Sequence, residues 1–276
     1  EFDSAESRIR WSMLFDYACV FHVGYDKVFQ KGGHPQAVLL PHCADATLFQ
    51  NSQRERIYEV GWVGNSEGSL YGRRRRIILH LAEHFRMNEW QRRHSQEEMA
   101  EVYQSSKIVV HVNRDDHTTV TGARHFEATA AGALLITGIP TDLTRLGFRE
   151  GEHFIGFRRE EEVADLVRYY LAHEEERQRI AESGREKTLQ EHTYDRRVET
   201  LLDLLEKDQG RFFAPARKGS EAEIRQIYLD YYAAHYLLDY SFEELRHLSQ
   251  LGPKALLKAI PPFTKGMLRI LRRTLA

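Results

Sequence analysis

The residues best suited to chemistry lie in one short stretch, Gly122 to Ala133, which contains Arg124, His125 and Glu127. A β-branched apolar run at 107–112 precedes this stretch, and a polar loop joins the two. In an open α/β sheet, ligands bind beyond the carboxyl ends of the strands, where a helix N-terminus offers free N–H groups and the positive end of its dipole. We therefore expect a phosphate to bind at the start of this helix.

Arg124 and Glu127 are three positions apart, so on a helix they share one face. The guanidinium of Arg124 would clamp a diphosphate oxygen, and the carboxylate of Glu127 would accept hydrogen bonds from both hydroxyls of a ribose. The alternative is an ordinary ion pair within the helix, which is common at this spacing. His125 is a further candidate for contact with phosphate or sugar.

A glycine-rich loop follows the strand expected at 57–64 and provides a second candidate site. Gly64 and Asn65 at the end of that strand would let a ligand approach the backbone closely. A run of four arginines, 73–76, comes next, and we select Arg75 as its phosphate contact. The alternative is that this run is only the solvated start of a helix.

We expect no metal and no nucleophilic hydrolase chemistry. His111 and His117 stand near His125, but the sequence has no H-E-x-x-H motif and no C-x-x-C pair. The two cysteines, Cys19 and Cys43, cannot form a disulfide framework and have no credible histidine partner in sequence.

Strand and helix patterns alternate along most of the chain. Helical stripes of period 3.6 follow short apolar runs, so we expect a Rossmann-like parallel sheet with helices on both faces. An all-helical segment with a different composition follows residue 210. The expected strands lie at 20–23, 37–40, 57–64, 107–112, 133–137 and 153–157, and the expected helices at 26–33, 77–85, 123–131, 163–171, 174–191 and 198–205.

Charge is distributed unevenly over the 276 residues. The net charge is −2, which argues against a nucleic-acid partner, but residues 251–276 carry six basic and no acidic side chains. A basic amphipathic helix there would lie on an anionic membrane surface, or would pack on the body with its charges extended into solvent. Without a spanning apolar run or a signal pattern, we expect a cytoplasmic protein, peripheral on the inner face of a membrane.

Four stretches together resemble a known family. In order, they are residues 60–65, 124–137, 161–170 and 192–197, and they resemble the C-terminal domain of GT-B fold glycosyltransferases of group 1 type, most closely the spore-maturation-protein-like ones. The resemblance implies a retaining transferase that uses a nucleoside-diphosphate sugar such as a UDP-sugar, with no metal and no cofactor. It implies that Glu127 holds the ribose, and that Arg124 and the Gly64–Asn65 loop face the diphosphate.

The resemblance also divides the chain and identifies a departure from the family pattern. Residues 1–50 resemble the last elements of an acceptor-side domain, 51–210 the donor-binding domain, and 211–276 a helical tail. Val120 stands where related enzymes often carry an acidic residue that contacts the donor sugar. The acceptor is unknown, and the alternatives are a non-catalytic scaffold of the same fold and an enzyme that modifies nucleotide sugars.

Overall fold

The computed structural model describes residues 2–50, 54–209, 211 and 219–274. The chain forms two compact units, one of residues 40–208 and one that combines residues 1–39 with 209–276. The boundaries drawn from the sequence were 50/51 and 210/211, whereas the units divide at 39/40 and 208/209. Pro215 and Gly219 in the sequence predict a linker before the C-terminal helices, and Pro215 lies outside the described residues.

A four-stranded parallel sheet forms the centre of the 40–208 unit, and its strands lie in chain order. They are β3 (Tyr58–Gly61), β4 (Ser106–His111), β5 (Leu134–Gly138) and β6 (Ile155–Phe157). Their residues are mostly buried, as expected for parallel strands that are covered on both sides. The predicted parallel sheet is therefore confirmed.

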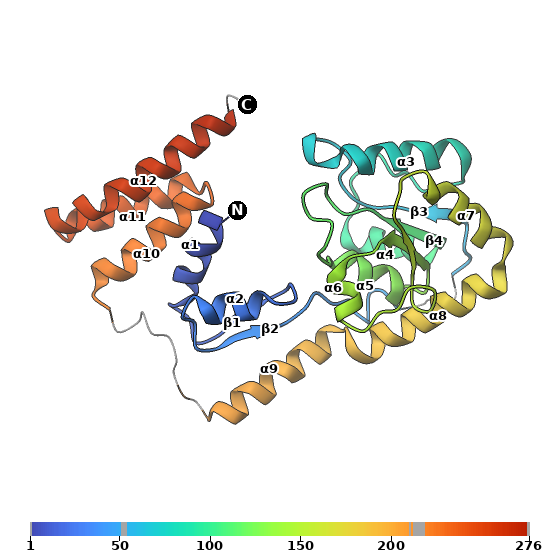
Figure 1. Cartoon of the computed structure of the whole chain (residues 1–276), viewed down its shortest axis with the longest axis horizontal. Helices are drawn as coiled ribbons and strands as arrows, with labels where there is room; N and C mark the ends of the chain where they lie inside the picture. Colours follow the sequence, from blue (N-terminus) through green and yellow to red (C-terminus); the bar gives the residue numbers. More distant parts are fainter. Residues whose placement is uncertain (1, 51–53, 210, 212–218, 275–276) are drawn as a thin grey trace. The chain divides into compact units, whose positions relative to one another are not determined.

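Alternate strand residues face two separate hydrophobic clusters, because successive side chains of a strand point to opposite faces. Ile108 and Ile136 pack with α3 (Gly72–His84) and α7 (Glu162–Ala172) on one face. Val109 and Leu135 pack with α4 (Gln96–Gln104) and α5 (Ala123–Ala130) on the other. Figure 1 shows these helices around the sheet, which confirms the predicted Rossmann-like arrangement.

Two helices of this unit were not predicted. One is α4, whose start carries a capping box in which Ser95 and Glu98 satisfy each other's backbone N–H groups. That S-x-x-E pattern was visible in the sequence and would have located the helix. The other is the short α6 (Thr141–Arg145), whose five residues are too few for a periodic signal.

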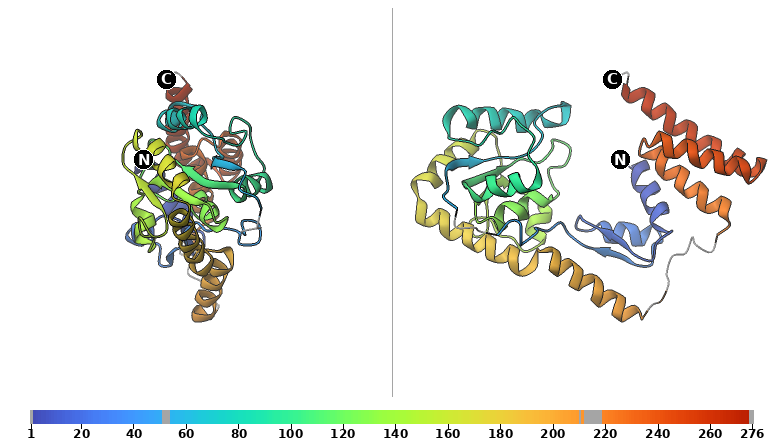
Figure 2. Two further views of the ribbon diagram at one scale, coloured as in Figure 1. Left: turned by 90° about the vertical axis from the view of Figure 1, so that its right-hand side faces the viewer. Right: turned by 180° about the vertical axis from the view of Figure 1, so that it is seen from behind.

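Two long helices close the unit, and α9 (Tyr194–Asp208) continues the direction of α8 (Glu174–Glu191) (Figure 2). Close packing of α8 depends on Gly184, because a Cβ there would lie 2.3 Å from the carbonyl oxygen of His153. One turn later, the hydroxyls of Thr188 and Thr129 hydrogen-bond at 2.7 Å, which ties α8 to α5.

The second unit joins the two parts of the chain that flank the sheet domain. A short β-α-β step, as predicted, consists of β1 (Ala18–Val20), α2 (Tyr25–Lys31) and β2 (Ala37–Leu39), with its two strands parallel. The other four helices are α1 (Phe2–Ser12), α10 (Glu221–Ala234), α11 (Leu238–Gln250) and α12 (Pro253–Thr274).

Contacts between α1 and α10 hold the two segments together. The rings of Trp11 and Tyr231 stack with centroids 4.4 Å apart, and Arg10 forms an ion pair with Asp230. None of the helices in the described part of the chain is both long and apolar enough to cross a membrane.

Candidate functional site

The candidate site lies where β3 and β4 end and α5 begins. Because β3 and β4 are parallel neighbours, the loops that follow them emerge at the same edge of the sheet. The side chain of Ser106 packs directly on Gly61, since a Cβ on Gly61 would lie 2.1 Å from the Ser106 hydroxyl. The chain then enters α5 at Gly122 and leaves it at Gly132, whose positive φ of 70° ends the helix as predicted.

Two guanidinium groups converge on the loops at this edge. Arg124 Nε donates to the carbonyl of Val63 at 3.0 Å. Arg74 donates from Nε to the carbonyl of Val112 at 2.8 Å, and from a terminal nitrogen to the carbonyl of Asn65 at 2.7 Å. Burial, and next the charge of Arg124, lowers the pKa of Arg74. Two neighbouring cations at a strand edge create the positive potential that an anionic ligand requires.

The structure brings together most of the residues selected from the sequence, but the arginine that reaches the site is the neighbour of the one selected. Gly64 lies between the two carbonyls that these arginines contact, because Arg124 binds the carbonyl of Val63 and Arg74 that of Asn65. Arg75 is exposed on α3, and the side chain that reaches Asn65 belongs to its neighbour Arg74. A run of four arginines does not reveal which one faces the sheet, because successive helix residues differ by about 100° in direction.

Glu127 is a buried carboxyl group, with only 8% of its surface exposed. Burial raises its pKa to about 7, against the opposing effect of the positive charge of Arg124. No ion pair joins Arg124 to Glu127 within the part of the chain that is described, because the Arg124 guanidinium is directed to Val63. The alternative of an ordinary ion pair within the helix therefore does not describe this structure.

Two further side chains from different elements support this arrangement. The buried hydroxyl of Tyr103, on α4, interacts with Arg124, and burial raises its pKa. Asn113, which follows β4, donates to the carbonyl of Val120 at 2.9 Å and so holds the loop that leads into α5. Neither residue can be selected from the sequence alone, because a lone tyrosine or asparagine carries no diagnostic spacing.

His125 lies beneath the site rather than facing it. Its Nδ1 accepts a hydrogen bond from the N–H of Gly122 at 3.1 Å, which caps α5, and its Nε2 lies 3.4 Å from the hydroxyl of Thr137. Burial lowers its pKa to about 4, so the ring is neutral. It packs edge-on against His111 at 4.4 Å. Both ring nitrogens have protein partners, so this geometry gives His125 a supporting role.

Thr121 is a polar residue of the site that the sequence analysis missed. It directly precedes the N-cap Gly122, is 1% exposed, and has a hydroxyl with no hydrogen-bond partner among the described residues. An unpaired buried hydroxyl costs free energy unless a ligand or water satisfies it. The free N–H groups of the first turn of α5 lie beside it. The N–H groups can bind an anion, whereas the Thr121 hydroxyl is enclosed by protein atoms beneath them.

Two other patterns were also missed in the sequence. Residues 64–68 fit G-x-S-x-G, the pattern of a serine nucleophile. Such a nucleophile needs a sharp turn from strand to helix, whereas here Ser66 lies in an irregular loop before the short 3-10 turn Ser69–Tyr71. His80 and His84 are spaced four apart beside Glu83, and they form a cluster on α3.

Known proteins share features with this chain. Residues 68–203 match the family model described as glycosyl transferase-like. Among solved structures, the chain is similar to sucrose-phosphate synthase from Thermosynechococcus elongatus, with a TM-score of 0.51, 15% identity, and coverage of 70% of this chain and 58% of the synthase. This likeness confirms the GT-B-type fold of the sheet domain.

Two further solved structures give lower scores. The pneumococcal O-GlcNAc transferase GtfA, in complex with UDP and GlcNAc, has a TM-score of 0.48 at 14% identity, and covers 73% of this chain and 47% of its own. A chain of the GtfA/B complex has a TM-score of 0.49 at 11% identity, with 71% and 46% covered. No curated protein sequence matches the chain. The chain thus spans 58% or less of the length of these three structures.

Proposed function

From this glycosyl transferase-like domain, we propose that the protein transfers a sugar from a nucleoside-diphosphate sugar, of the UDP-sugar type, to an acceptor. We further propose that the transfer is retaining and needs no metal. The observation that carries the proposal is the convergence of Arg74 and Arg124 on the loops that follow β3 and β4, next to the first turn of α5. This is a cationic edge with hydrogen-bond donors, as a diphosphate requires.

In the proposed complex, the diphosphate lies against the first turn of α5 and accepts hydrogen bonds from its N–H groups. Negative charge grows on the diphosphate as the bond to the sugar breaks, so donors that are already in place stabilise the transition state. The guanidinium groups of Arg74 and Arg124 supply the cationic charge that a metal ion would otherwise provide. The carboxylate of Glu127, three residues after Arg124 on the same helix, accepts hydrogen bonds from the ribose hydroxyls.

The test is calorimetric titration with UDP, GDP and their sugars, in the presence of EDTA. We expect one nucleotide to bind, and R74A, R124A and E127A each to weaken binding by about tenfold or more, the equivalent of about 1.4 kcal/mol. R168A is the matched control, because Arg168 is an exposed helical arginine paired with Asp165. R75A tests whether Arg75, the residue selected from the sequence, contributes to nucleotide binding or whether only its neighbour Arg74 does.

The outcomes also separate the alternatives. Undiminished binding in R74A and R124A would contradict the donor site. Binding without transfer to any acceptor in a panel of glycans, peptides and lipid-linked sugars would favour the scaffold, and conversion of the bound nucleotide sugar itself would favour an enzyme that modifies nucleotide sugars.

A second proposal concerns location. We propose that α12 binds an anionic membrane surface on the cytoplasmic side. Leu257 and Ile260 are exposed on this helix, as are Lys254 and Lys258. Flotation with vesicles of phosphatidylserine and phosphatidylcholine should recover the full chain but not a chain that ends at residue 250. Equal recovery of both would contradict the proposal.

A further inference from the structure

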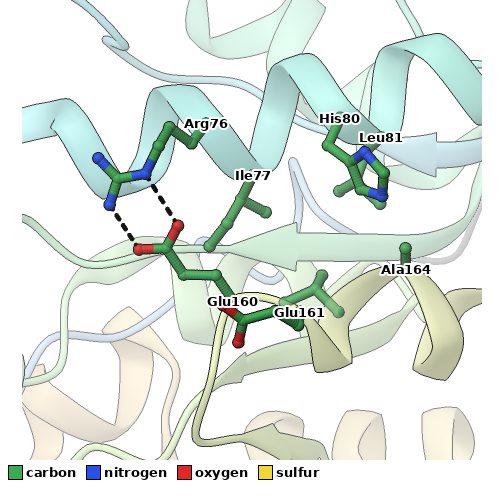
Figure 3. A pocket seen from close by; sticks show the side chains of 8 residues that line it. Arg76, Ile77, His80, Leu81, Glu160, Glu161 and Ala164 are labelled. Carbon is green, nitrogen blue, oxygen red and sulfur yellow. Dashed lines mark hydrogen bonds and ion pairs between the residues drawn. The ribbon is translucent and has the colours of Figure 1, made fainter.

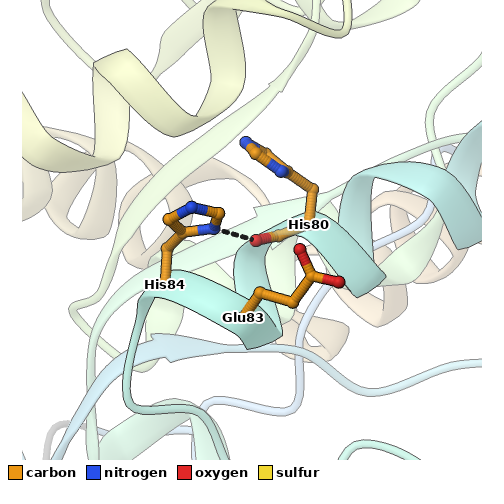
Figure 4. Close-up of side chains that lie close together, drawn as sticks. All are labelled: His80, Glu83 and His84. Atoms are coloured by element: carbon orange, nitrogen blue, oxygen red, sulfur yellow. Dashed lines mark hydrogen bonds between the residues drawn. The ribbon is translucent and has the colours of Figure 1, made fainter.

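A cluster of metal-ligating side chains lies on α3, outside the proposed donor site. His80, Glu83 and His84 are all exposed, and one ligand atom from each lies within 4.8 Å of the others (Figure 4). Their spacing of three and four residues places them on one face of the helix. The two imidazole rings lie with centroids 4.5 Å apart.

The hydrogen bonding of His84 fixes which of its nitrogens is free. Its Nδ1 lies 2.8 Å from the carbonyl oxygen of His80, and a bond to a carbonyl requires this nitrogen to carry the proton. The lone pair is therefore on Nε2. Histidines that bind metals almost always donate their other ring N–H in this way, because the bond orients the ring and fixes its tautomer.

The surroundings of the cluster favour a cation. His84 is the last residue of α3, so the three side chains lie at the C-terminal end, where the helix dipole attracts positive charge. The carboxylate of Glu83 adds a negative charge, and imidazole nitrogen selects zinc, copper or nickel over magnesium and calcium.

His80 also lines a cavity of about 330 Å³ between α3 and α7 (Figure 3). Arg76 and Glu160, which also line this cavity, bind each other through two hydrogen bonds of 3.0 and 2.6 Å. The cavity therefore keeps open space beside the His80 side chain.

We propose that His80, Glu83 and His84 bind one divalent transition-metal ion of the zinc class, with remaining coordination positions open to solvent. Two imidazoles and one carboxylate are a three-ligand set known for zinc, which leaves the fourth tetrahedral position open. The ion would fix the last turn of α3, the helix that carries Arg74 near its start. This inference does not depend on the proposed transferase activity.

The experiment is calorimetric titration of the untagged full chain with Zn²⁺ in excess Mg²⁺. We expect one tight ion per chain, with binding at that site weakened by about tenfold or more in H80Q and in H84Q, and less in E83Q. The matched control is H173Q. His173 is also exposed at the end of a helix and also hydrogen-bonds the carbonyl four residues before it, at 2.7 Å, but that residue is Tyr169.

A second measurement identifies the ligands. Electron paramagnetic resonance of the chain loaded with one equivalent of Cu²⁺ should show two coordinated nitrogens, and one fewer in H84Q. Zn²⁺ binding that is unchanged in H80Q and H84Q, or that falls equally in H173Q, would overturn the proposal. Titration with UDP in the same variants keeps the two proposals separate, because we expect nucleotide binding to be unchanged in each.

Discussion

Glu127 is the residue at which function and stability conflict. Its carboxyl group is buried, and its neighbour Arg124 is directed to a backbone carbonyl. Burial keeps its pKa near 7, so the folded chain holds this proton more tightly than the unfolded chain, where the pKa is about 4.5. A proposed ligand that donates two hydrogen bonds would relieve the cost of ionising it.

The stability consequence has a definite sign. Because the pKa of Glu127 is higher in the folded chain than in the unfolded chain, protonation of its carboxyl group favours the folded state. This contribution to stability is fully present below about pH 4.5 and is lost as the pH rises to about 7. We therefore predict that E127Q is more stable than the unsubstituted chain by roughly 2–3 kcal/mol at pH 8, and equally stable at pH 4. Urea unfolding of both proteins from pH 4 to 8 measures the difference, and a gap that does not change with pH would contradict the assignment.

Residue types and spacing predicted much of the site but not its details. Arg124 and Glu127 could be selected because a strand, loop and helix around them were visible in the sequence. Thr121 could not, because only the fold shows that its hydroxyl is buried without a partner. The choice between Arg74 and Arg75 depends on the rotation of α3 against the sheet, which the local sequence does not determine.

At the scale of elements, Arg56 holds together the edge of the sheet opposite the site. It precedes β3 and donates to four backbone carbonyls, those of Tyr103, Ser106, Ala131 and Gly132, at 3.2, 2.6, 3.0 and 2.8 Å. These carbonyls lie at the ends of α4 and α5 and the start of β4. The Arg56 side chain thus hydrogen-bonds backbone carbonyls at the ends of three secondary-structure elements.

We predict that R56M lowers the free energy of unfolding by about 3 kcal/mol or more, because it leaves several carbonyls with fewer hydrogen bonds. R56K should recover only part of the loss, since an ammonium group lacks the planar fork that reaches four acceptors. Urea unfolding gives the stability, and UDP titration of the folded proteins should give unchanged affinity. A loss of affinity equal to that of R124A would show that the two edges are not independent.

The packing of α8 gives a second prediction at this scale. Replacing a helical glycine with alanine usually stabilises by about 0.5–1 kcal/mol. At Gly184 we predict the opposite, a loss of about 1–3 kcal/mol, because the new Cβ would meet the carbonyl of His153 at 2.3 Å and force the helix away. Thermal unfolding of G184A measures the sign, and a rise in Tm would contradict the close contact.

Elements were predicted best where their pattern was long. The strands of the sheet followed from short apolar runs, and α3, α7 and α9 from apolar stripes of period 3.6. The helix α8 was predicted although it is mostly charged, and α5 was predicted between a polar loop and Gly132. The order of the strands in the sheet and the capping of α5 by His125 cannot be predicted from the periodicity of apolar residues.

At the scale of the whole molecule, the division into two units leads to a further prediction. The residues of the proposed donor site, namely Gly64, Asn65, Arg74, Thr121, Arg124 and Glu127, all lie in the 40–208 unit. This unit has its own sheet and two hydrophobic clusters, as an independently folding domain requires. We predict that a fragment of residues 40–208 unfolds cooperatively and binds UDP with the affinity of the full chain. A fragment that is folded but does not bind would show that the other unit contributes to the site.

The sequence predicted an α/β body with a helical tail, but it did not predict that the tail packs with residues 1–39. Residues 1–39 pack with 209–276 because Trp11 and Arg10 meet Tyr231 and Asp230, residues that are far away in the sequence. Contacts of this kind leave no local signal.

That pairing has a consequence for the order of events during synthesis. Residues 1–39 leave the ribosome before the sheet domain, but α10 becomes available only after the whole sheet domain has been made. At roughly 5–20 residues per second, the delay is about 10–40 s. During this time, α1 lacks the surface against which Trp11 stacks, while the sheet domain can already fold. Chaperones that recognise exposed aromatic side chains would therefore meet this protein through α1.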